Sequence, residues 1–493
     1  MTYKVNEQLE KILDEEKGNR LSVIVRMASS DEKDQNKNES LLLEIASDGI
    51  RQRNISMSAR DLLPDTQLNR QRKRSSIKQT LTTDSTNELR KIGLNYIEPL
   101  LSSEIVNSEQ SKKEQKNIQS FWTSRSVYLN VLKDDLRKLL DEVPQIRSIY
   151  PNRVLKVPKL VEVKNLPPVV LENKTSSWGI QKIGALAAWG AYNARGEGVK
   201  VGLLDTGVDS KHPDLDGKIS SWAEFDENGK LIQDSTPYDS DQHGTHCAGI
   251  IAGGNASGQW IGVAPEAKLA VALVLNGKNG GTDAQVLAGI DWLVEQNVDV
   301  ISMSLGGLTL GPETPSTYTE AILTCLTAGI PVVTAIGNEG NQTTGSPGND
   351  IFAYSVGATD YYDRAAGFSG GRTHIIRQSS FIPPEQLPIP YSKPDVVAPG
   401  VAIRSSIPEM KWGAFNGTSM ATPHVAGAIA LLLSATSIRN RTKADQKAIL
   451  IQNLLTGSVD ELGESGQDHR FGFGRIDVLR AIGFAIERGY GNS

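Results

Sequence analysis

The sequence has little cysteine, little net charge and no long apolar segment. Only two of its 493 residues are cysteine, Cys247 and Cys325, too few for a disulfide framework, which agrees with a reducing compartment. The formal net charge of −5 gives no reason to expect binding to nucleic acid or to an anionic membrane. No run is apolar and long enough to span a bilayer, and Met1 to Arg26 lack the apolar core of a signal peptide. We therefore expect a cytoplasmic globular protein.

The composition changes near residue 175. A hydrophobic fraction of 39% supports ordinary buried cores, and the length allows two or three domains. Charged residues are frequent and glycines rare before residue 175, whereas Gly-rich loops and aliphatic runs follow it. We expect an N-terminal domain at 1–157, an extended linker with Pro158, Pro167 and Pro168 at 158–174, and a second domain at 175–493.

The first 157 residues predict a small α+β domain that an insertion divides. The insertion, about residues 35–118, is polar and helix-prone and contains the basic run Arg70 to Arg74. Such a run favours a solvated face; a partner-binding or processing site is the alternative. The predicted elements around the insertion are a strand at 20–26, a strand at 126–132, a helix at 133–143, and extended segments at 146–150 and 154–157.

The second domain alternates aliphatic strands with helices. This pattern predicts an α/β fold with a doubly wound, mostly parallel sheet that helices cover on both faces. In such sheets the ligand crevice lies beyond the carboxyl ends of the strands. The predicted strands are 199–204, 268–273, 298–304, 331–335 and 353–357, and the predicted helices are one from 243, one at 284–296 and one at 318–328.

Four polar residues occupy predicted strand ends or helix starts. Asp205 follows the strand at 199–204, His243 opens a helix, and Asn338 follows the strand at 331–335. Ser419 lies at the start of an apolar helix, where unpaired backbone N–H groups would stabilise an oxyanion; a simple helix cap is the alternative. We expect Pro423 to fall in the first turn of that helix. An acid, a base, an amide donor and a hydroxyl can thus meet in one crevice.

These segments resemble the subtilisin-like serine peptidases, in that family's order of Asp, His and Ser. The resemblance runs roughly from Trp178 to the C terminus and includes residues 472–478. It implies a serine endopeptidase in which Ser419 is the nucleophile and His243 its base. Asp205 would orient the imidazole, and Asn338 with the Ser419 N–H would form the oxyanion hole.

The resemblance also implies a peptide-binding cleft. Its two edges, which would hold an extended peptide between them, are Gly280 and Gly281 on one side and Ser304, Leu305 and Gly306 on the other. The walls of the first specificity pocket would be Ala335, Gly337 and Gly345, with Glu339 at the rim, so large side chains are favoured and a basic preference stays open.

Other polar residues near these motifs favour structural interpretations. His246 and His424 are expected to be hydrogen-bonded structural histidines, and Cys325 a core residue. Cys247 is expected to pack beneath the base, and in the resemblance it marks a thiol-containing subset that is sensitive to mercurials. The chemistry requires no cofactor. Calcium stays undecided, because Asp214 matches a ligand position of the family but Ala256 stands where an oxygen ligand is expected.

The N-terminal domain resembles the family's inhibitory prodomain, which sends an extended tail through the cleft. We therefore expect a zymogen that cleaves itself between Val157 and Trp178. Its partners would be protein or peptide substrates, its own prodomain, and a regulatory partner of the insertion. A second insertion, Gly367 to Pro390, predicts a surface loop beside the cleft or a docking site.

Three alternative functions compete with this hypothesis. An aspartic peptidase would need a second motif like Asp205-Thr206-Gly207, whereas the sequence contains this motif only once. A catalytically inactive peptide-binding module would not need four competent residues at the catalytic positions. Nucleotide binding would place a glycine-rich turn after a strand, whereas Gly196 and Gly198 precede theirs.

Overall fold

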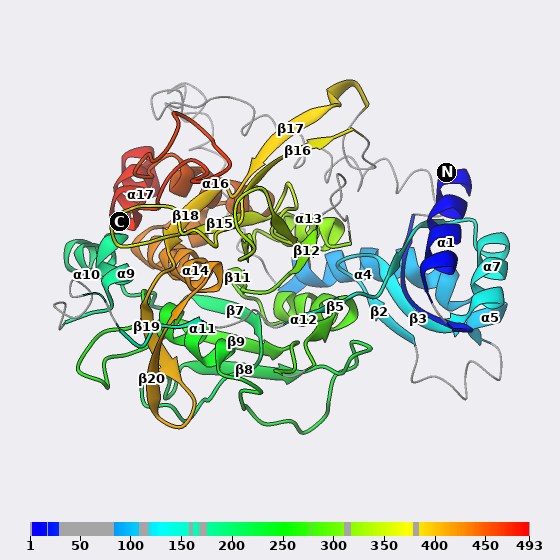
Figure 1. Ribbon diagram of the computed structural model, residues 1–493, viewed down its shortest axis with the longest axis horizontal. Helices are drawn as coiled ribbons and strands as arrows, with labels where there is room; N and C mark the ends of the chain where they lie inside the picture. Colours follow the sequence, from blue (N-terminus) through cyan, green and yellow to red (C-terminus); the bar gives the residue numbers. More distant parts are fainter. Residues whose placement is uncertain are drawn as a thin grey trace.

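A computed structural model describes residues 2–16, 18–28, 83–107, 118–156, 161–165, 167, 175–277, 279–309, 317–377 and 384–492 (Figure 1). The basic run Arg70 to Arg74, most of the linker at 158–174 and residues 378–383 lie outside these ranges.

A parallel sheet of seven strands forms the centre of the larger part of the molecule, as expected. Its strands are nearly all buried, which explains their continuous aliphatic sequences. The order across the sheet is β18 (Val396–Pro399), β15 (Tyr354–Thr359), β13 (Val332–Ala335), β11 (Val300–Met303), β7 (Lys200–Asp205), β9 (Lys268–Leu273) and β8 (Ile219–Glu224).

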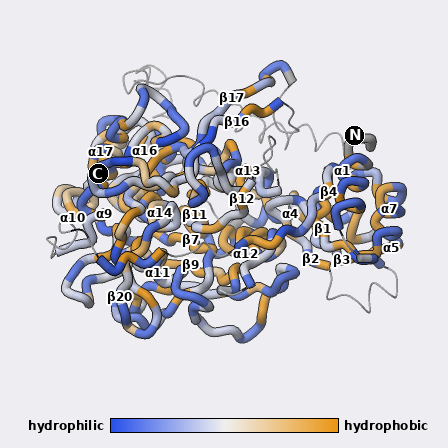
Figure 2. Tube along the Cα trace, viewed as in Figure 1, coloured by the Kyte–Doolittle hydropathy of each residue, from blue (hydrophilic) through white to orange (hydrophobic). Residues whose placement is uncertain are grey.

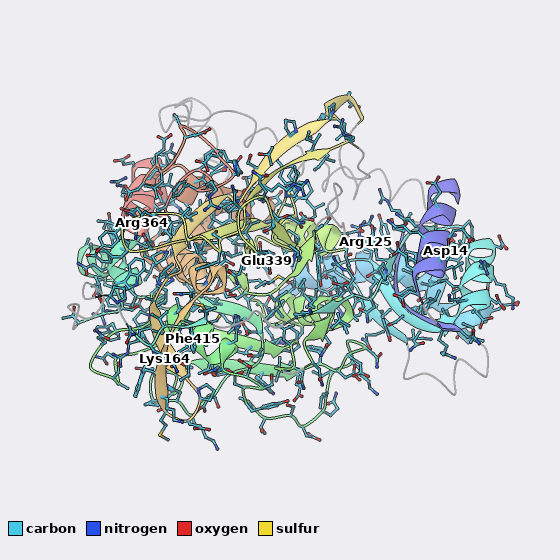
Figure 3. All side chains as sticks on the ribbon, in the orientation of Figure 1. Asp14, Arg125, Lys164, Glu339, Arg364 and Phe415 are labelled. Atoms are coloured by element: carbon cyan, nitrogen blue, oxygen red, sulfur yellow. The ribbon has the colours of Figure 1, made fainter. Side chains whose placement is uncertain are left out.

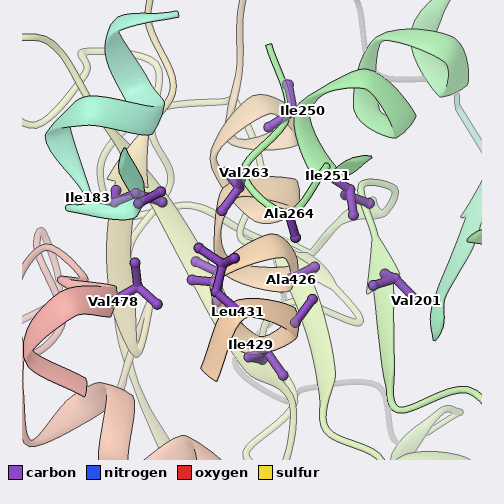
Figure 4. Packing of buried hydrophobic residues seen from close by; sticks show 14 of the residues in the cluster. Ile183, Val201, Ile250, Ile251, Val263, Ala264, Ala426, Ile429, Leu431 and Val478 are labelled. Atoms are coloured by element: carbon purple, nitrogen blue, oxygen red, sulfur yellow. The ribbon is translucent and has the colours of Figure 1, made fainter. Parts of the chain in front are cut away.

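Helices cover both faces of this sheet. One face packs against α14 (Thr418–Ala435), α11 (His243–Ala252), α10 (Ala185–Tyr192) and α17 (Val478–Ala485), with Ile429 and Leu431 of α14 in the core (Figure 4). The other face packs against α12 (Asp283–Glu295) and α13 (Thr319–Thr327). Hydrophobic segments accordingly concentrate in the interior (Figure 2). The remaining helices of this part include α9 (Trp178–Lys182), α15 (Ile438–Arg441) and α16 (Ala444–Thr456).

Helix α14 is the central helix of the core. It is the one helix in the described ranges whose length and composition would allow a membrane crossing, but 94% of it is buried inside the protein. The expectation for Pro423 was wrong, because α14 already begins at Thr418 and Pro423 is its sixth residue. The N–H that proline lacks would have bonded to the carbonyl of Ser419. That carbonyl accepts instead from Ser304 Oγ at 3.0 Å and from the Cys247 thiol at 3.4 Å.

The described residues among 2–151 form a separate folded unit, here called the N-terminal module. Its antiparallel sheet has the order β2 (Ile118–Phe121), β3 (Ser126–Leu132), β1 (Arg20–Met27) and β4 (Ile146–Pro151). Its helices are α1 (Thr2–Glu15), α4 (Thr83–Leu101), α5 (Glu104–Asn107) and α7 (Lys133–Glu142), around a core of its own. Two of them, α4 and α5, lie in the predicted helix-prone insertion.

Short strand pairs line the edges of the larger part. The segment after the module, here called the tail, contributes β5 (Val154–Leu155) and β6 (Val161–Glu162). Strand β5 pairs with β10 (Gly281–Thr282). Strand β6 pairs with one side of β20 (Lys411–Asn416), whose other side pairs with β19 (Ile403–Ile407). Part of the predicted linker is therefore a paired strand.

Two further strand pairs lie near the sheet. One joins β12 (Gly307–Thr309) to β14 (Thr344–Ser346). The second insertion, predicted as a surface loop, contains the paired strands β16 (Arg372–Ile376) and β17 (Ile389–Lys393), which project from the molecule (Figure 1).

Candidate active site

The fold brings Asp205 and His243 into direct contact. Asp205 is the last residue of β7, His243 is the first of α11, and both are fully buried. Asp205 Oδ1 lies 2.6 Å from His243 Nδ1 and also accepts the Thr206 N–H at 2.7 Å. Burial is the largest single influence on the pKa of His243 and lowers it, but the charges and hydrogen bonds of Asp205 and Cys247 together raise it more, so that the pKa lies well above its usual value.

The other nitrogen of His243 points to no acceptor. His243 Nε2 is buried and has no hydrogen-bond partner among the residues that the structure describes. An imidazole whose Nδ1 is held by a carboxylate presents Nε2 as a base for an incoming proton.

Ser419 is the second residue of α14, and its side chain is 2% exposed. Its Oγ lies 3.5 Å from the Ser304 carbonyl oxygen. Because Ser419 is in the first turn, its backbone N–H belongs to the group that the helix itself leaves unpaired. The hydroxyl and a free N–H therefore lie together at the positive end of the helix dipole.

The Asn338 amide has a fixed orientation. Its Oδ1 accepts from the Thr418 N–H at 2.8 Å and from the Thr418 hydroxyl at 2.9 Å. The opposite atom, Nδ2, is thereby left to donate beside Gly417 and Ser419. Sequence reasoning had not singled out Thr418, although it lies in the same motif as Ser419.

The structural interpretations of His246, His424 and the cysteines agree with their surroundings. His246 Nε2 lies 3.1 Å from the Ile403 carbonyl, and burial lowers the pKa of His246 to about 3. His424 Nδ1 lies 2.7 Å from the Met420 carbonyl, and burial lowers its pKa to about 4. Cys247 and Cys325 are fully buried, and burial raises the pKa of Cys247 to about 11. Cys247 Sγ lies 3.8 Å from His243 Nδ1.

The predicted cleft edges lie on either side of the tail. Gly281 pairs with Leu155, and a Cβ on Gly280 would come within 2.0 Å of the Leu155 carbonyl oxygen. On the other side, a Cβ on Gly307 would come within 3.3 Å of the Leu155 side chain. Ser304, Leu305 and Gly306 directly precede Gly307 in the chain, so the tail lies between Gly281 and the residue that follows the second predicted segment.

The predicted pocket walls also meet. The Gly345 N–H donates to the Ile336 carbonyl at 2.8 Å, which joins the segment of Gly345 to the segment of Ala335 and Gly337. Gly337 has a φ of 114°, a value that favours glycine. Glu339 accepts the Asn338 N–H at 2.9 Å and lies near the centre of the molecule's face (Figure 3).

The residues at the family's calcium position do not fit calcium. Asp214 Oδ1 accepts the Ala256 N–H, and Asp214 Oδ2 accepts the Trp412 indole N–H, both at 2.6 Å. Calcium needs six to eight oxygen ligands, and here both carboxylate oxygens face N–H donors.

The combination of these features defines a class. An Asp–His pair, a serine at a helix start and an amide aimed beside it, at the carboxyl edge of a doubly wound sheet, is the arrangement of a serine hydrolase. The aspartic peptidase alternative fails because Asp205 contacts a histidine. The nucleotide alternative fails because Gly196 and Gly198 precede β7.

Comparison with known proteins gives the family. A profile of the Subtilase family matches residues 196–474. The chain is 38% identical over 285 residues to the intracellular serine protease of Paenibacillus polymyxa, covering 56% of this chain and 79% of that protein. It is 38% identical over 262 residues to subtilisin E of Bacillus subtilis (52% of this chain, 61% of the relative) and 35% identical over 306 residues to thermitase of Thermoactinomyces vulgaris (62% and 95%).

The chain belongs to the subtilase family, and it is a serine endopeptidase that acts on proteins or peptides.

Proposed function

We propose that this chain is the zymogen of a cytoplasmic serine endopeptidase whose N-terminal module inhibits it until the tail is cut. Ser419 is the nucleophile, His243 the base that takes its proton, and Asp205 the acid that holds the imidazole. Asn338 Nδ2 and the Ser419 N–H receive the oxyanion. The mechanism requires no metal.

The proposed chemistry follows from these four roles. His243 Nε2 removes the Ser419 proton as Oγ attacks the substrate carbonyl, and Asp205 stabilises the resulting imidazolium. His243 then gives the proton to the leaving amine. A water molecule attacks the acyl-enzyme in the same way and restores Ser419.

The course of the tail is the observation that carries the zymogen proposal. Leu155 is 1% exposed between the two cleft edges and pairs with Gly281 in an antiparallel ladder. Six residues later, Val161 pairs with Asn416, three positions before Ser419. The tail thus pairs with a predicted cleft edge at Leu155 and with the strand that leads to Ser419 at Val161, which supports binding like that of an extended peptide substrate. The cut then falls at a bond within residues 156–161, a shorter span than the expected range from Val157 to Trp178, and one that also includes the Lys156–Val157 bond just before that range.

The contacts of the module with α12 and α13 support inhibition. Asp291 accepts the N–H groups of Trp122 and Thr123, at 2.8 and 3.0 Å. Glu320 forms ion pairs with Arg125 at 3.2 Å and Arg26 at 3.7 Å, and all three side chains are at most 8% exposed. Arg125 lies where the module meets the larger part (Figure 3).

Two further features support the remaining parts of the proposal. Relatives with similar sequences include proteins named as intracellular serine proteases, which supports a cytoplasmic location. The two N–H donors on Asp214 support catalysis without calcium at that position.

A fluorophosphonate probe tests the assignment of the nucleophile. We expect it to label the processed wild type and not the Ser419→Ala variant. If a folded and processed wild type takes no label while still binding peptides, the chain is a peptide-binding module instead.

A further inference from the structure

Asp239 lies in a segment that connects the two halves of the Asp205–His243 pair. Residues 238–240 run antiparallel to residues 206–208, directly after Asp205. The Val208 N–H donates to the Tyr238 carbonyl at 3.0 Å, and the Ser240 N–H donates to the Thr206 carbonyl at 2.9 Å. Four residues after Asp239, the chain reaches His243 and enters α11.

The Asp239 carboxylate accepts four hydrogen bonds. Oδ1 accepts the Thr206 hydroxyl at 2.7 Å and the Asp241 N–H at 3.1 Å. Oδ2 accepts the Thr245 N–H at 2.7 Å and the Thr245 hydroxyl at 2.5 Å. One carboxylate therefore holds the residue that follows Asp205 and the residue two positions after His243.

The same network continues between these two residues. The Gly244 N–H donates to Thr206 Oγ1 at 2.9 Å, and the Asp209 N–H donates to Thr245 Oγ1 at 2.9 Å. The Thr206 hydroxyl thus accepts from the first turn of α11 while it donates to Asp239. Apart from the local bond from Asp241, these links join the chain just after β7 to the first turn of α11, and β7 and α11 are the elements that carry Asp205 and His243.

We propose that Asp239 is a positioning residue that keeps Asp205 and His243 in register for proton transfer. Asp205 reaches His243 from another element through a single 2.6 Å contact, whereas Asp239 ties the two backbones together through Thr206 and Thr245. A displacement of about 1 Å between catalytic groups is enough to lower a rate by roughly 10²-fold. The proposal rests on the function proposed for Asp205, His243 and Ser419.

A buried carboxylate elsewhere in the same part of the chain supplies a control. Asp214 is 1% exposed and also joins distant segments, through Ala256 and Trp412. It has no hydrogen bond to the residues adjoining Asp205 or His243 among its described contacts. Asp214→Asn should lower thermal stability without changing the chemistry.

The test uses the full chain, allowed to process, with active sites titrated by a fluorophosphonate. We compare kcat, KM and the pH profile of kcat/KM on a peptide anilide substrate. The proteins compared are the wild type, Asp239→Ala, Asp214→Asn, Thr206→Val and Thr206→Ser. We expect Asp239→Ala to lower kcat per active site by about 10- to 100-fold, with KM within about twofold. We expect the acid limb of its profile to move to lower pH, because Asp205 is held less firmly against His243 and its charge then raises the pKa of His243 less.

The two variants of Thr206 distinguish the effect of its hydroxyl group from the effect of its packing. Valine keeps the shape of threonine but has no hydroxyl, whereas serine keeps both hydrogen bonds. We expect Thr206→Val to follow Asp239→Ala and Thr206→Ser to stay within about threefold of wild type. These two variants also provide the answer if Asp239→Ala does not fold.

The proposal is overturned if Asp239→Ala or Thr206→Val loses only stability, with kcat per active site and the acid limb unchanged. It is also overturned if Thr206→Ser is as impaired as Thr206→Val. A wild type without activity dependent on Ser419 would instead contradict the proposed function, so the two failures are distinct.

Discussion

Two regions of the larger part of the chain contain buried carboxylates whose partners differ in kind. At the end of β7, Asp205 is fully buried against His243 within the same part of the chain. On α12 and α13, Asp283, Asp291 and Glu320 are also buried, but they face the N-terminal module and its tail. Asp283, for example, accepts from Arg153 Nε at 2.8 Å and from Arg153 Nη2 at 3.0 Å.

The Asp205–His243 contact is permanent, whereas the contacts with the N-terminal module and its tail can be removed. A buried carboxylate that loses its partner is costly only while it stays buried. Asp205 keeps its partner for the life of the fold. Asp283, Asp291 and Glu320 would return to water when the module leaves, so their contacts hold an inhibitor without making its release prohibitive. Four predictions test this comparison.

The largest effect is expected from the permanent contact. Asp205→Asn would offer an amide to His243 Nδ1 and would favour the wrong tautomer. We expect kcat to fall on the order of 10⁴-fold, with little change in KM. Steady-state kinetics on titrated enzyme check this result, and a loss below tenfold would show that Asp205 does not orient the imidazole.

The removable contact with the clearest control is Glu320. Glu320→Gln removes the buried negative charge that pairs with Arg26 and Arg125 across the contact, which weakens binding of the module by at least about tenfold. Glu295→Gln removes a pair with Arg90 that is 33% and 50% exposed, where at most a few-fold change is expected. The release rate of the cleaved module, followed by size-exclusion chromatography, distinguishes them. Equal rates in both variants would contradict the comparison.

The contact at Asp291 should make release depend on pH. Burial raises the pKa of Asp291 to about 7, although hydrogen bonds from Thr123 and Trp122 oppose this shift. Once exposed, the group returns toward its ordinary value, so the bound state takes up a proton that the free state does not. Binding is therefore strongest at low pH and weakens as the pH rises toward about 7.

The expected measurement is a release rate on the order of 10-fold slower at pH 5.5 than at pH 8. It is read from separated fragments, because proteolytic activity has a pH dependence of its own. Asp291→Asn should flatten the profile. A wild-type rate that is constant over this range, or that falls as the pH rises, would contradict the assignment.

The smallest effect on basal activity is expected at Cys247. Its thiol is a weak donor to the Ser419 carbonyl, and Ser304 donates to the same oxygen. Cys247→Val should keep kcat within a few-fold of wild type and should resist mercurials that act by modifying the thiol 3.8 Å from His243 Nδ1. Inhibition that persists in this variant would place the reactive thiol elsewhere.

The main sheet could be predicted because its strands are continuous aliphatic runs. Strand β8, at the edge, was not predicted: its side chains are mostly half-buried, so its sequence, Ile219 to Glu224, lacks such a run. Helix α1 was also missed, although Val5, Leu9, Ile12 and Leu13 recur at helical spacing and are buried.

The residues of the candidate site could be named from motifs, but several of their supports could not. Thr418, Asp239 and Trp412 act through hydrogen bonds between segments far apart in sequence, and no local pattern marks such contacts. The prediction that Pro423 falls in the first turn of its helix was wrong for a related reason. Carbonyls released by a proline inside a helix can be satisfied by side chains from other elements, here Ser304 and Cys247.

Intact mass measurement of the purified wild type beside Ser419→Ala tests the central claim most directly. We predict two fragments for the wild type, meeting at one bond within residues 156–161, and a single uncut chain of 53.4 kDa for Ser419→Ala. An uncut wild type that is fully active, or the same cut in purified Ser419→Ala, would contradict the account.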